Sequence, residues 1–425
     1  MNKKQKSIII GSFLSGTLVL TACGSHVSSN SANTSKVKNV TFWYSVPGAS
    51  NDVIKNLVQK FNDSHPNIHI IATNNPQNER IQKLTAALGA GNPPDIYTAG
   101  SPDLAMLLGS RKVSSISDLT NGRINPDKFY AAPRSVSVED SKLFAMPASV
   151  GDVALYYNQD LFKKYGISTP PKNWGEMIRD AMRLTDPSQG RYGFVIPTTP
   201  DDYTAQLWTC YLWENGGELF TADNKKVAFN SKEGVEALQL WVDLIYKYKV
   251  APLRTLDQNS AMQTFATGQY GMIPAMPIFV QAATKFPFHV ATAVLPKEKI
   301  QATSLGGWYI TIPKMSKHQK EAATFLEWLN RPENGVQWNI GMGSLPVGPE
   351  STNSSIYKDY LKKTPLVQAF VDQLDVAKAP PNLPQYSQIS KLLAVAINNA
   401  LYKKQTPQEA LDEAANKANQ LLKGN

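Results

Sequence analysis

From residue 40 onward, short runs of β-branched and aromatic residues alternate with amphipathic segments. Residues 40–44 read Val-Thr-Phe-Trp-Tyr, a run that predicts a strand, and a second apolar run at 68–71 predicts the next one. Between them, residues 51–62 repeat apolar positions at helical spacing and place on one face Val53, Ile54, Leu57, Val58 and Phe61. Strands that alternate with helices in this way predict an α/β fold.

Hydroxyl residues predict where several helices begin. Thr406 is followed three residues later by Glu409, and Ser316 by Gln319. Both pairs fit a capping box, in which each side chain accepts a hydrogen bond from the other's free backbone N–H. Ser231 precedes another amphipathic segment and is expected to cap it.

The first 39 residues differ from the rest of the chain. Three lysines precede an apolar stretch at 8–20, which is too short to cross a bilayer, and Leu20-Thr21-Ala22-Cys23 follows it. This start resembles a bacterial lipoprotein signal. The resemblance implies a cleaved signal peptide at 1–22 and a diacylglyceryl group on Cys23; an ordinary secreted protein with a free Cys23 is the alternative. Residues 23–39, rich in Ser and Asn, are expected to form a flexible tether.

Charge and size exclude some classes of protein. Removing residues 1–22 with their three lysines lowers the formal net charge from +9 to +6, and no dense run of Lys and Arg remains. Nucleic acid is therefore not an expected partner. The remaining chain of about 400 residues exceeds what one hydrophobic core supports, so two domains or lobes are expected.

Motifs for catalysis or metal binding do not stand out. The five histidines are scattered, and the closest pair, His65 and His69, is interrupted by Pro66. No nucleophile elbow, phosphate-binding loop or dinucleotide fingerprint occurs. Cys210 lies in an apolar segment and is expected to pack in a core. We expect neither an enzyme nor a cofactor or metal.

Eight segments, taken in chain order, resemble the sugar-binding lipoproteins of bacterial ATP-binding-cassette importers, the solute-binding family that includes maltodextrin-binding protein. They include TFWYSVPG near the start, ENGGELF in the middle and PNLPQYSQI near the end. The full set is Thr41–Gly48, Lys83–Leu104, Phe144–Ile167, Pro170–Met177, Glu214–Phe220, Phe265–Met272, Gly306–Leu329 and Pro381–Ile389.

This resemblance implies a two-lobed periplasmic-binding-protein-like (type II) fold with hinge crossovers and a cleft between the lobes. The N-terminal lobe would comprise 40–148 and 308–350, and the C-terminal lobe 149–307 and 351–425. The family's mechanism implies an open–closed equilibrium in which a carbohydrate contacts both lobes only in the closed state. A membrane permease would be the partner of a monomer held by its lipid on the outer face of the cell membrane.

A sugar offers apolar C–H faces and a rim of hydroxyls, so its site needs aromatic plates and fixed donors and acceptors. Trp174, Trp241, Trp328 and Trp338 sit in helical patterns and are expected in cores. Trp308 follows two glycines on the segment that lines the cleft in the family. For Trp208 a core position is an equal alternative. The predicted ligand-binding residues are Tyr44, Ser45, Gln77, Ser101, Asp103, Asp152, Trp208, Gly307, Trp308 and Tyr386.

Two of these predictions depend on finer arguments. Strand alternation allows only one of Trp43 and Tyr44 to face away from the core, so either Tyr44 or Ser45 reaches the cleft. Asp152 follows the position at which the maltodextrin binder has a sugar-binding acid, and that position is Gly151 here. The departure makes maltodextrin itself a doubtful ligand.

A di- or oligosaccharide is the expected ligand. The alternative of the same fold is glycerol 3-phosphate or a related phosphodiester, which needs Arg or helix amides on the phosphate. The late segments 341–346 and 381–389 contain no Arg, which disfavours it. Two alternatives belong to other classes of protein: a surface glycosidase, and an adhesin that binds no small ligand.

Overall fold

The computed structural model describes residues 37–46, 48–77 and 79–423, and the predicted lipid site at Cys23 lies outside these residues. Its larger sheet has the strand order β2-β1-β3-β12-β6. The first three strands run parallel, whereas β12 is antiparallel to both of its neighbours. The bounds are β1 (Lys38–Tyr44), β2 (Ile68–Asn74), β3 (Ile96–Gly100), β6 (Met146–Gly151) and β12 (Gly306–Thr311). The first strand thus begins two residues before the predicted Val40.

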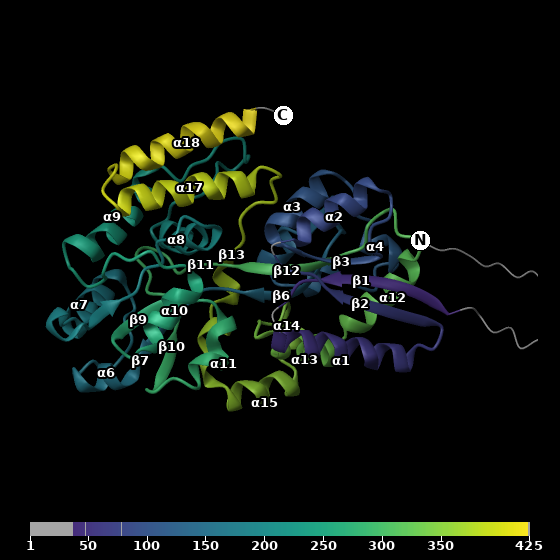
Figure 1. The fold of residues 1–425 in the computed structure, drawn as a ribbon, viewed down its shortest axis with the longest axis horizontal. Helices are drawn as coiled ribbons and strands as arrows, with labels where there is room; N and C mark the ends of the chain where they lie inside the picture. The colour runs from purple at the N-terminus through teal and green to yellow at the C-terminus, as the bar shows by residue number, and fades with distance from the viewer. Residues whose placement is uncertain (1–36, 47, 78, 424–425) are drawn as a thin grey trace, which may run out of the picture. The chain divides into compact units, whose positions relative to one another are not determined.

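Helices cover both faces of this sheet, with α2 and α3 on one side and α1 and α13 on the other (Figure 1). The face predicted on 51–62 packs inward, since Ile54 and Phe61 are fully buried. The helices of this part are α1 (Gly48–Ser64), α2 (Arg80–Gly89), α3 (Ser101–Gly109), α4 (Ile116–Leu119), α5 (Ala131–Ser135), α12 (Gln319–Leu329), α13 (Pro332–Met342) and α14 (Pro349–Thr352).

The second sheet has the order β10-β7-β9-β8. Its strands are β7 (Ala154–Asn158), β8 (Tyr192–Phe194), β9 (Tyr270–Ala275) and β10 (Val290–Ala293). Strands of two residues form two separate pairs, β4 (Val138–Glu139) with β5 (Lys142–Leu143) and β11 (Thr303–Ser304) with β13 (Ala377–Lys378). Short 3-10 turns lie at η1 (Pro126–Lys128), η2 (Pro187–Gln189), η3 (Pro277–Phe279), η4 (Pro365–Val367) and η5 (Leu374–Val376).

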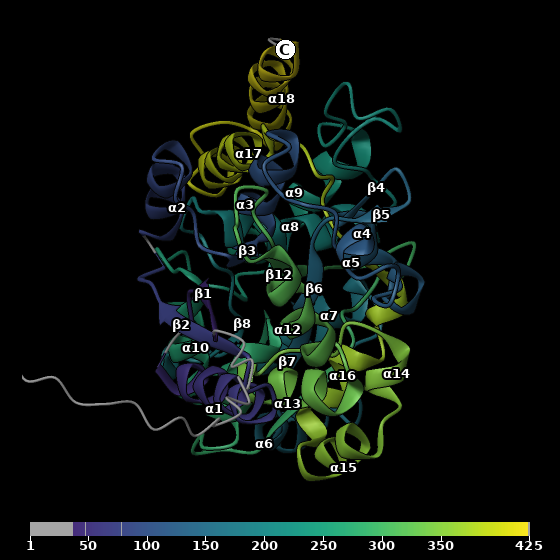
Figure 2. The same cartoon turned by 90° about the vertical axis from the view of Figure 1, so that its right-hand side faces the viewer.

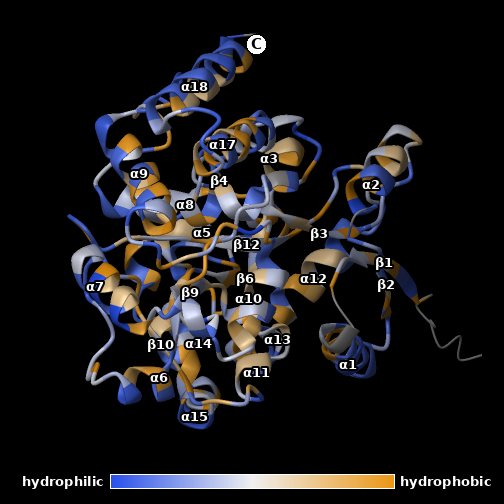
Figure 3. Cartoon of the chain, turned by 60° about the vertical axis from the view of Figure 1, so that its left-hand side comes forward, coloured by the Kyte–Doolittle hydropathy of each residue, from blue (hydrophilic) through white to orange (hydrophobic). Residues whose placement is uncertain are grey.

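Helices from two distant parts of the chain pack around the second sheet. They are α6 (Gln159–Lys164), α7 (Trp174–Leu184), α8 (Asp202–Glu214), α9 (Lys232–Tyr246), α10 (Gln258–Ala266), α11 (Val280–Ala283), α15 (Ser355–Lys363), α16 (Gln368–Val371), α17 (Tyr386–Leu401) and α18 (Pro407–Lys423). The last two lie side by side (Figures 1 and 2). Along α18, hydrophobic and hydrophilic residues alternate, as expected of a helix with one buried face (Figure 3).

The chain passes from the first sheet to the second between Gly151 and Ala154. It returns at Gly306, where β12 begins, and then α15 to α18 pack with the second sheet. The lobe boundaries that the sequence suggested, 148/149, 307/308 and 350/351, stay predictions. The two-lobed α/β fold that we predicted is confirmed.

Two of the three predicted helix caps form. Thr406 and Glu409 make both bonds of a capping box, at 3.2 and 2.9 Å, and Ser231 Oγ accepts from the N–H of Gly234. The prediction at Ser316 is wrong: its hydroxyl donates to Asp95 and accepts from the N–H of His318, whereas the helix begins at Gln319 with His318 at its N-cap. The bond to Asp95 fixes the Ser316 side chain before the helix starts, so it turns to the N–H two residues on.

The tryptophans predicted for the cores are buried in them: Trp174, Trp241, Trp328 and Trp338. Cys210 is fully buried and accepts a hydrogen bond from the N–H of Ser304, as a packing residue can. Among the described residues, no helix is both long and apolar enough to cross a membrane.

Candidate ligand-binding cleft

A cleft of about 540 Å³ lies where the first sheet, the second sheet and α17 meet. Ligand pockets in proteins typically enclose about 300–1,000 Å³, so this cleft can hold a small molecule. Its lining comes from segments as far apart in the chain as Ser45 and Ser390.

The first wall is built at the carboxyl ends of the parallel strands β1 and β3, where open α/β sheets bind ligands. Ser45 follows β1, and Gly100 and Ser101 lie where β3 leads into α3. The Ser101 hydroxyl both donates to the carbonyl of Gly307 and accepts from its N–H, each at 3.3 Å. This pair of bonds ties the wall to β12.

Arg80 contributes the only cationic side chain among the described residues that line the cleft. Its Nε donates to Asp103 Oδ2 at 2.7 Å and its Nη1 to the carbonyl of Gln77 at 2.6 Å. The guanidinium carbon lies 5.4 Å from the ring centre of Trp308, within the range of a cation–π contact. Three contacts therefore fix a side chain that would otherwise be free to move.

The floor consists of the neighbouring strands β6 and β12, which contribute Ser149–Gly151 and Leu305–Trp308. Glycine is needed at Gly307, where a Cβ would come within 2.9 Å of the Ser149 carbonyl oxygen. Two neighbouring glycines also lie in tight places. A Cβ at Gly306 would come within 3.0 Å of the Gln206 amide, and one at Gly151 within 3.1 Å of Pro277. Trp308 is the aromatic plate of this floor.

The opposite wall begins at two capped helices. Asp201 accepts from the N–H of Thr204 and so places Asp202 in the first turn of α8. Asp257 and Ser260 form a capping box that places Gln258 and Asn259 at the start of α10. Asp202, Gln258 and Asn259 line the cleft at these helix starts. Further lining on this side comes from Gln206, Ile278 and Tyr386.

Tyr386, at the start of α17, is the second aromatic side chain of the cleft. Burial raises the pKa of its phenol, and the nearby Asp202 charge adds to this effect. The hydroxyl therefore stays protonated at neutral pH and can both donate and accept a hydrogen bond.

The structure places six of the predicted binding residues at the cleft: Ser45, Gln77, Ser101, Gly307, Trp308 and Tyr386. Two predicted aromatic residues lie elsewhere. Tyr44 is buried in the core beside the first sheet, and its hydroxyl donates to Asn51 at 2.7 Å. Because successive side chains of a strand point to opposite faces, Ser45 is the one that faces the cleft. Trp208 is fully buried in the core of the second lobe, on a helix that is covered nearly all round.

The two predicted acids also need correction. Asp103 does not line the cleft but lies behind Arg80, with 8% of its side chain exposed. Asp152 is completely buried, and neither of its carboxylate oxygens has a hydrogen-bond partner. Burial raises its pKa well above the usual range. Asp152 directly follows Gly151, which lines the cleft. Successive residues of an extended chain point to opposite faces, so Asp152 points into the interior.

Sequence reasoning missed Arg80, Asp202, Gln206, Gln258 and Asn259. The last four follow cap residues, Asp201 and Asp257, that open helices after apolar runs, a pattern that could have indicated exposed helix starts. Arg80 had no such marker, since its importance depends on Asp103 and Trp308, which are far away in the sequence.

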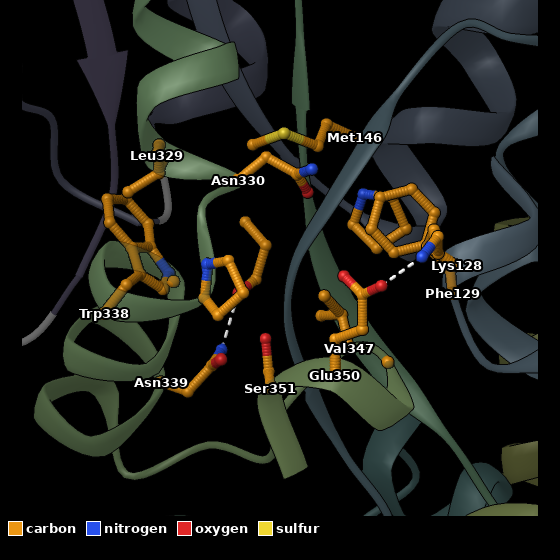
Figure 4. A pocket seen from close by; sticks show the side chains of 15 residues that line it. Lys128, Phe129, Met146, Leu329, Asn330, Trp338, Asn339, Val347, Glu350 and Ser351 are labelled. Carbon is orange, nitrogen blue, oxygen red and sulfur yellow. Dashed lines mark hydrogen bonds and ion pairs between the residues drawn. The ribbon is translucent and has the colours of Figure 1, made fainter. Parts of the chain in front are cut away.

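A smaller cavity of about 40 Å³ lies under β6, between η1 and α13. Lys128 and Glu350 point toward each other and form an ion pair at one side, while the Asn339 amide donates to the carbonyl of Ala148 at 2.7 Å (Figure 4). A water molecule needs about 10–15 Å³ by this measure. The cavity therefore has room for a few waters and not for a solute.

The cleft offers hydroxyls, amides, one carboxylate and one guanidinium around two aromatic rings. Within the described part of the chain, no three His, Cys, Asp or Glu side chains gather in a way that could hold a metal ion. This arrangement suits the reversible capture of a small polar molecule between two lobes, and it defines a solute-binding protein.

Comparison with known sequences gives the family. Residues 48–336 match the model described as bacterial extracellular solute-binding protein, and the chain belongs to this family. Its relatives include the sn-glycerol-3-phosphate-binding periplasmic protein UgpB of Escherichia coli K12, which is 25% identical over 92% of this chain and 94% of its own.

Solved structures agree with the fold. The cyclic α-maltosyl-1,6-maltose binding protein of Arthrobacter globiformis is 28% identical, with a TM-score of 0.83 over 92% of this chain and 100% of its own. UgpB of Mycobacterium tuberculosis, in complex with glycerophosphocholine, is 19% identical with a TM-score of 0.78 over 90% of this chain and 98% of its own. At that identity the second likeness shows the fold alone.

Proposed function

We propose that this protein captures a neutral carbohydrate, a di- or oligosaccharide, in the cleft and delivers it to the membrane permease of an ATP-binding-cassette importer. The observation that carries the proposal is the composition of the cleft wall. Two aromatic rings, Trp308 and Tyr386, stand among uncharged donors and acceptors such as Gln206, Gln258 and Asn259. Apolar sugar faces stack on such rings, while hydroxyls bond the amides.

The relatedness to the Arthrobacter binding protein supports an oligosaccharide, because that protein's ligand is a cyclic maltose-derived sugar. The geometry also argues against a glycosidase. Hydrolysis of a glycosidic bond uses two carboxyl groups roughly 5–9.5 Å apart. Among the described residues lining the cleft, Asp202 provides the only carboxylate.

Glycerol 3-phosphate remains the second candidate, favoured by the relatedness to UgpB and by the presence of Arg80 in the cleft. Asp103 already neutralises this arginine, and Asp202 adds a negative charge to the lining of the cleft. A phosphate would thus meet a cleft without net positive charge, which disfavours it relative to a neutral sugar.

Calorimetry with the full chain and a panel of maltose-, glucose- and galactose-based oligosaccharides tests the proposal, with sn-glycerol 3-phosphate included. We expect at least one neutral sugar to bind with a Kd of about 1 μM, near −8 kcal/mol, and to raise the melting temperature. Binding of every sugar at millimolar affinity or weaker, with tight binding of glycerol 3-phosphate, would favour the second candidate. Absence of any ligand-dependent rise in melting temperature would favour an adhesin.

We further propose that a lipid on Cys23 keeps the protein close to its permease on the outer face of the cell membrane. Two acyl chains give stable anchoring, at about 0.8 kcal/mol per buried methylene. Replacing Cys23 by Ala should release the chain from membranes and leave its affinity for sugar unchanged, as fractionation and calorimetry would measure. A loss of affinity in the released chain would contradict this separation of roles.

A further inference from the structure

Only part of the Arg80 guanidinium is free to bond a ligand in the cleft. The Nε side is occupied by Asp103 and one Nη1 hydrogen by the carbonyl of Gln77. The Nη2 atom of Arg80 has no hydrogen-bond partner among the described residues. It lies near Gly100, 3.8 Å from where a Cβ would stand, and Asp103 Oδ2 lies at the same distance from that point. Because Arg80 itself lines the cleft and Asp103 does not, the Nη2 edge is available to a ligand oxygen.

Asp103 fixes the position of the Arg80 side chain from the side that faces away from the cleft. It sits in the first turn of α3, its side chain is 8% exposed, and it does not line the cleft. Arg80 is 19% exposed, so the ion pair is largely shielded from water and is screened less than a surface pair. The nearby Tyr97 hydroxyl adds no charge to the pair, because burial raises the pKa of its phenol and keeps it protonated.

We infer that Asp103 determines the charge selectivity of the cleft: it cancels the charge of Arg80, so that Arg80 donates to neutral hydroxyl or ring oxygens and phosphorylated ligands are rejected. The sugar half of this inference rests on the proposed function, whereas the rejection of anions does not. Asp103 acts through Arg80 and is therefore a positioning and specificity-determining residue, without direct contact to the ligand.

The variant Asp103→Asn tests the inference because an amide oxygen can still accept from Arg80 Nε while the negative charge is lost. We expect its affinity for sn-glycerol 3-phosphate, and more weakly for inorganic phosphate, to rise about tenfold or more over the wild type. The gain should shrink as ionic strength increases, since part of Arg80 faces solvent. Affinity for the sugar should change by less than about threefold, because Arg80 keeps its position.

Two further variants separate local from general charge effects. Asp359→Asn makes the same change in net charge at an exposed position on α15 outside the cleft, and should gain no affinity for either anion. The double variant Arg80→Gln, Asp103→Asn should lose the gain again. Asp103→Ser serves as a second test if the Asn variant does not fold.

Micromolar binding of sn-glycerol 3-phosphate by the wild type would overturn the inference at once. So would Asn and Ser variants at 103 that fold but gain no affinity for anions, or an equal gain in Asp359→Asn. Failure of every neutral sugar to bind the wild type, combined with a gain of anion binding in Asp103→Asn, would refute the proposed ligand and leave the selectivity role standing.

Discussion

Replacing Trp308 with Ala is expected to weaken sugar binding about 30-fold or more. Truncation of a central aromatic side chain in a binding site costs about 2 kcal/mol or more, and every 1.4 kcal/mol is tenfold in affinity. The variant loses the indole ring on the cleft floor, on which a sugar would stack. Arg80 loses a contact as well, because its guanidinium carbon lies 5.4 Å from the centre of the same ring. Calorimetry with the best sugar from the panel measures the loss.

Tyr402→Ala is a suitable control for this experiment. Tyr402 is also a partly buried aromatic residue, but it bonds Thr255 and does not line the cleft. Its loss should leave affinity unchanged. A decrease of less than threefold in Trp308→Ala would mean that the sugar does not stack on the floor of the cleft.

The second large effect is expected at Asp152, where Asn should stabilise the protein at neutral pH. The carboxyl is fully buried, its two oxygens have no hydrogen-bond partner, and the nearby Gln373 amide donates to the carbonyl of Val153 instead. Burial therefore raises the pKa of Asp152 well above its ordinary value of 3.8. A buried polar group left in this state costs about 1–3 kcal/mol, more if it is charged.

The pH dependence follows from the sign of that shift. Below the ordinary pKa of an aspartic acid, the folded and unfolded chains are both protonated at this position. As the pH rises above it, the unfolded chain releases the proton and the folded chain keeps it, so the free energy of unfolding falls. Asp152→Asn removes this loss, and its advantage over the wild type should grow between pH 4 and pH 7 by about 1–3 kcal/mol.

Urea unfolding at several pH values measures this trend. Asp223 provides the control, because a hydrogen bond from the Thr221 hydroxyl lowers its pKa and it is fully exposed. Asp223→Asn should show a weak trend of the opposite sign. An Asp152→Asn variant that is equally destabilised at pH 4 and pH 7 would show that the native carboxyl is bonded and ionised.

The elements of the fold could be predicted because their information is local. The face from Val53 to Phe61 repeats every three to four residues, and Thr406 and Glu409 lie within one turn of each other. Where a distant group competes, the same reasoning fails: Ser316 bonds Asp95, which lies 221 residues earlier in the chain. The family resemblance supplied the two lobes, which periodicity alone does not give.

The cleft could be predicted only in part, for a related reason. Segments that end a strand, such as Ser45 and Ser101, could be placed from the sequence because the ends of parallel strands share one edge of a sheet. The choice between Tyr44 and Ser45 required the direction of one side chain. Trp208 could not be assigned because nearly every position of its helix is buried, which leaves no polar face to mark the cleft.

The position of β12 also has a consequence for how the protein comes to be folded. This strand pairs with both β3 and β6, yet it begins only at Gly306. Until that residue has been synthesised, β3 and β6 each lack a neighbour, and the first lobe cannot close its sheet. Unpaired strand edges invite association with other chains. Folding that waits until β12 has been synthesised would avoid this exposure, and translocation across a membrane before folding is one way to provide it.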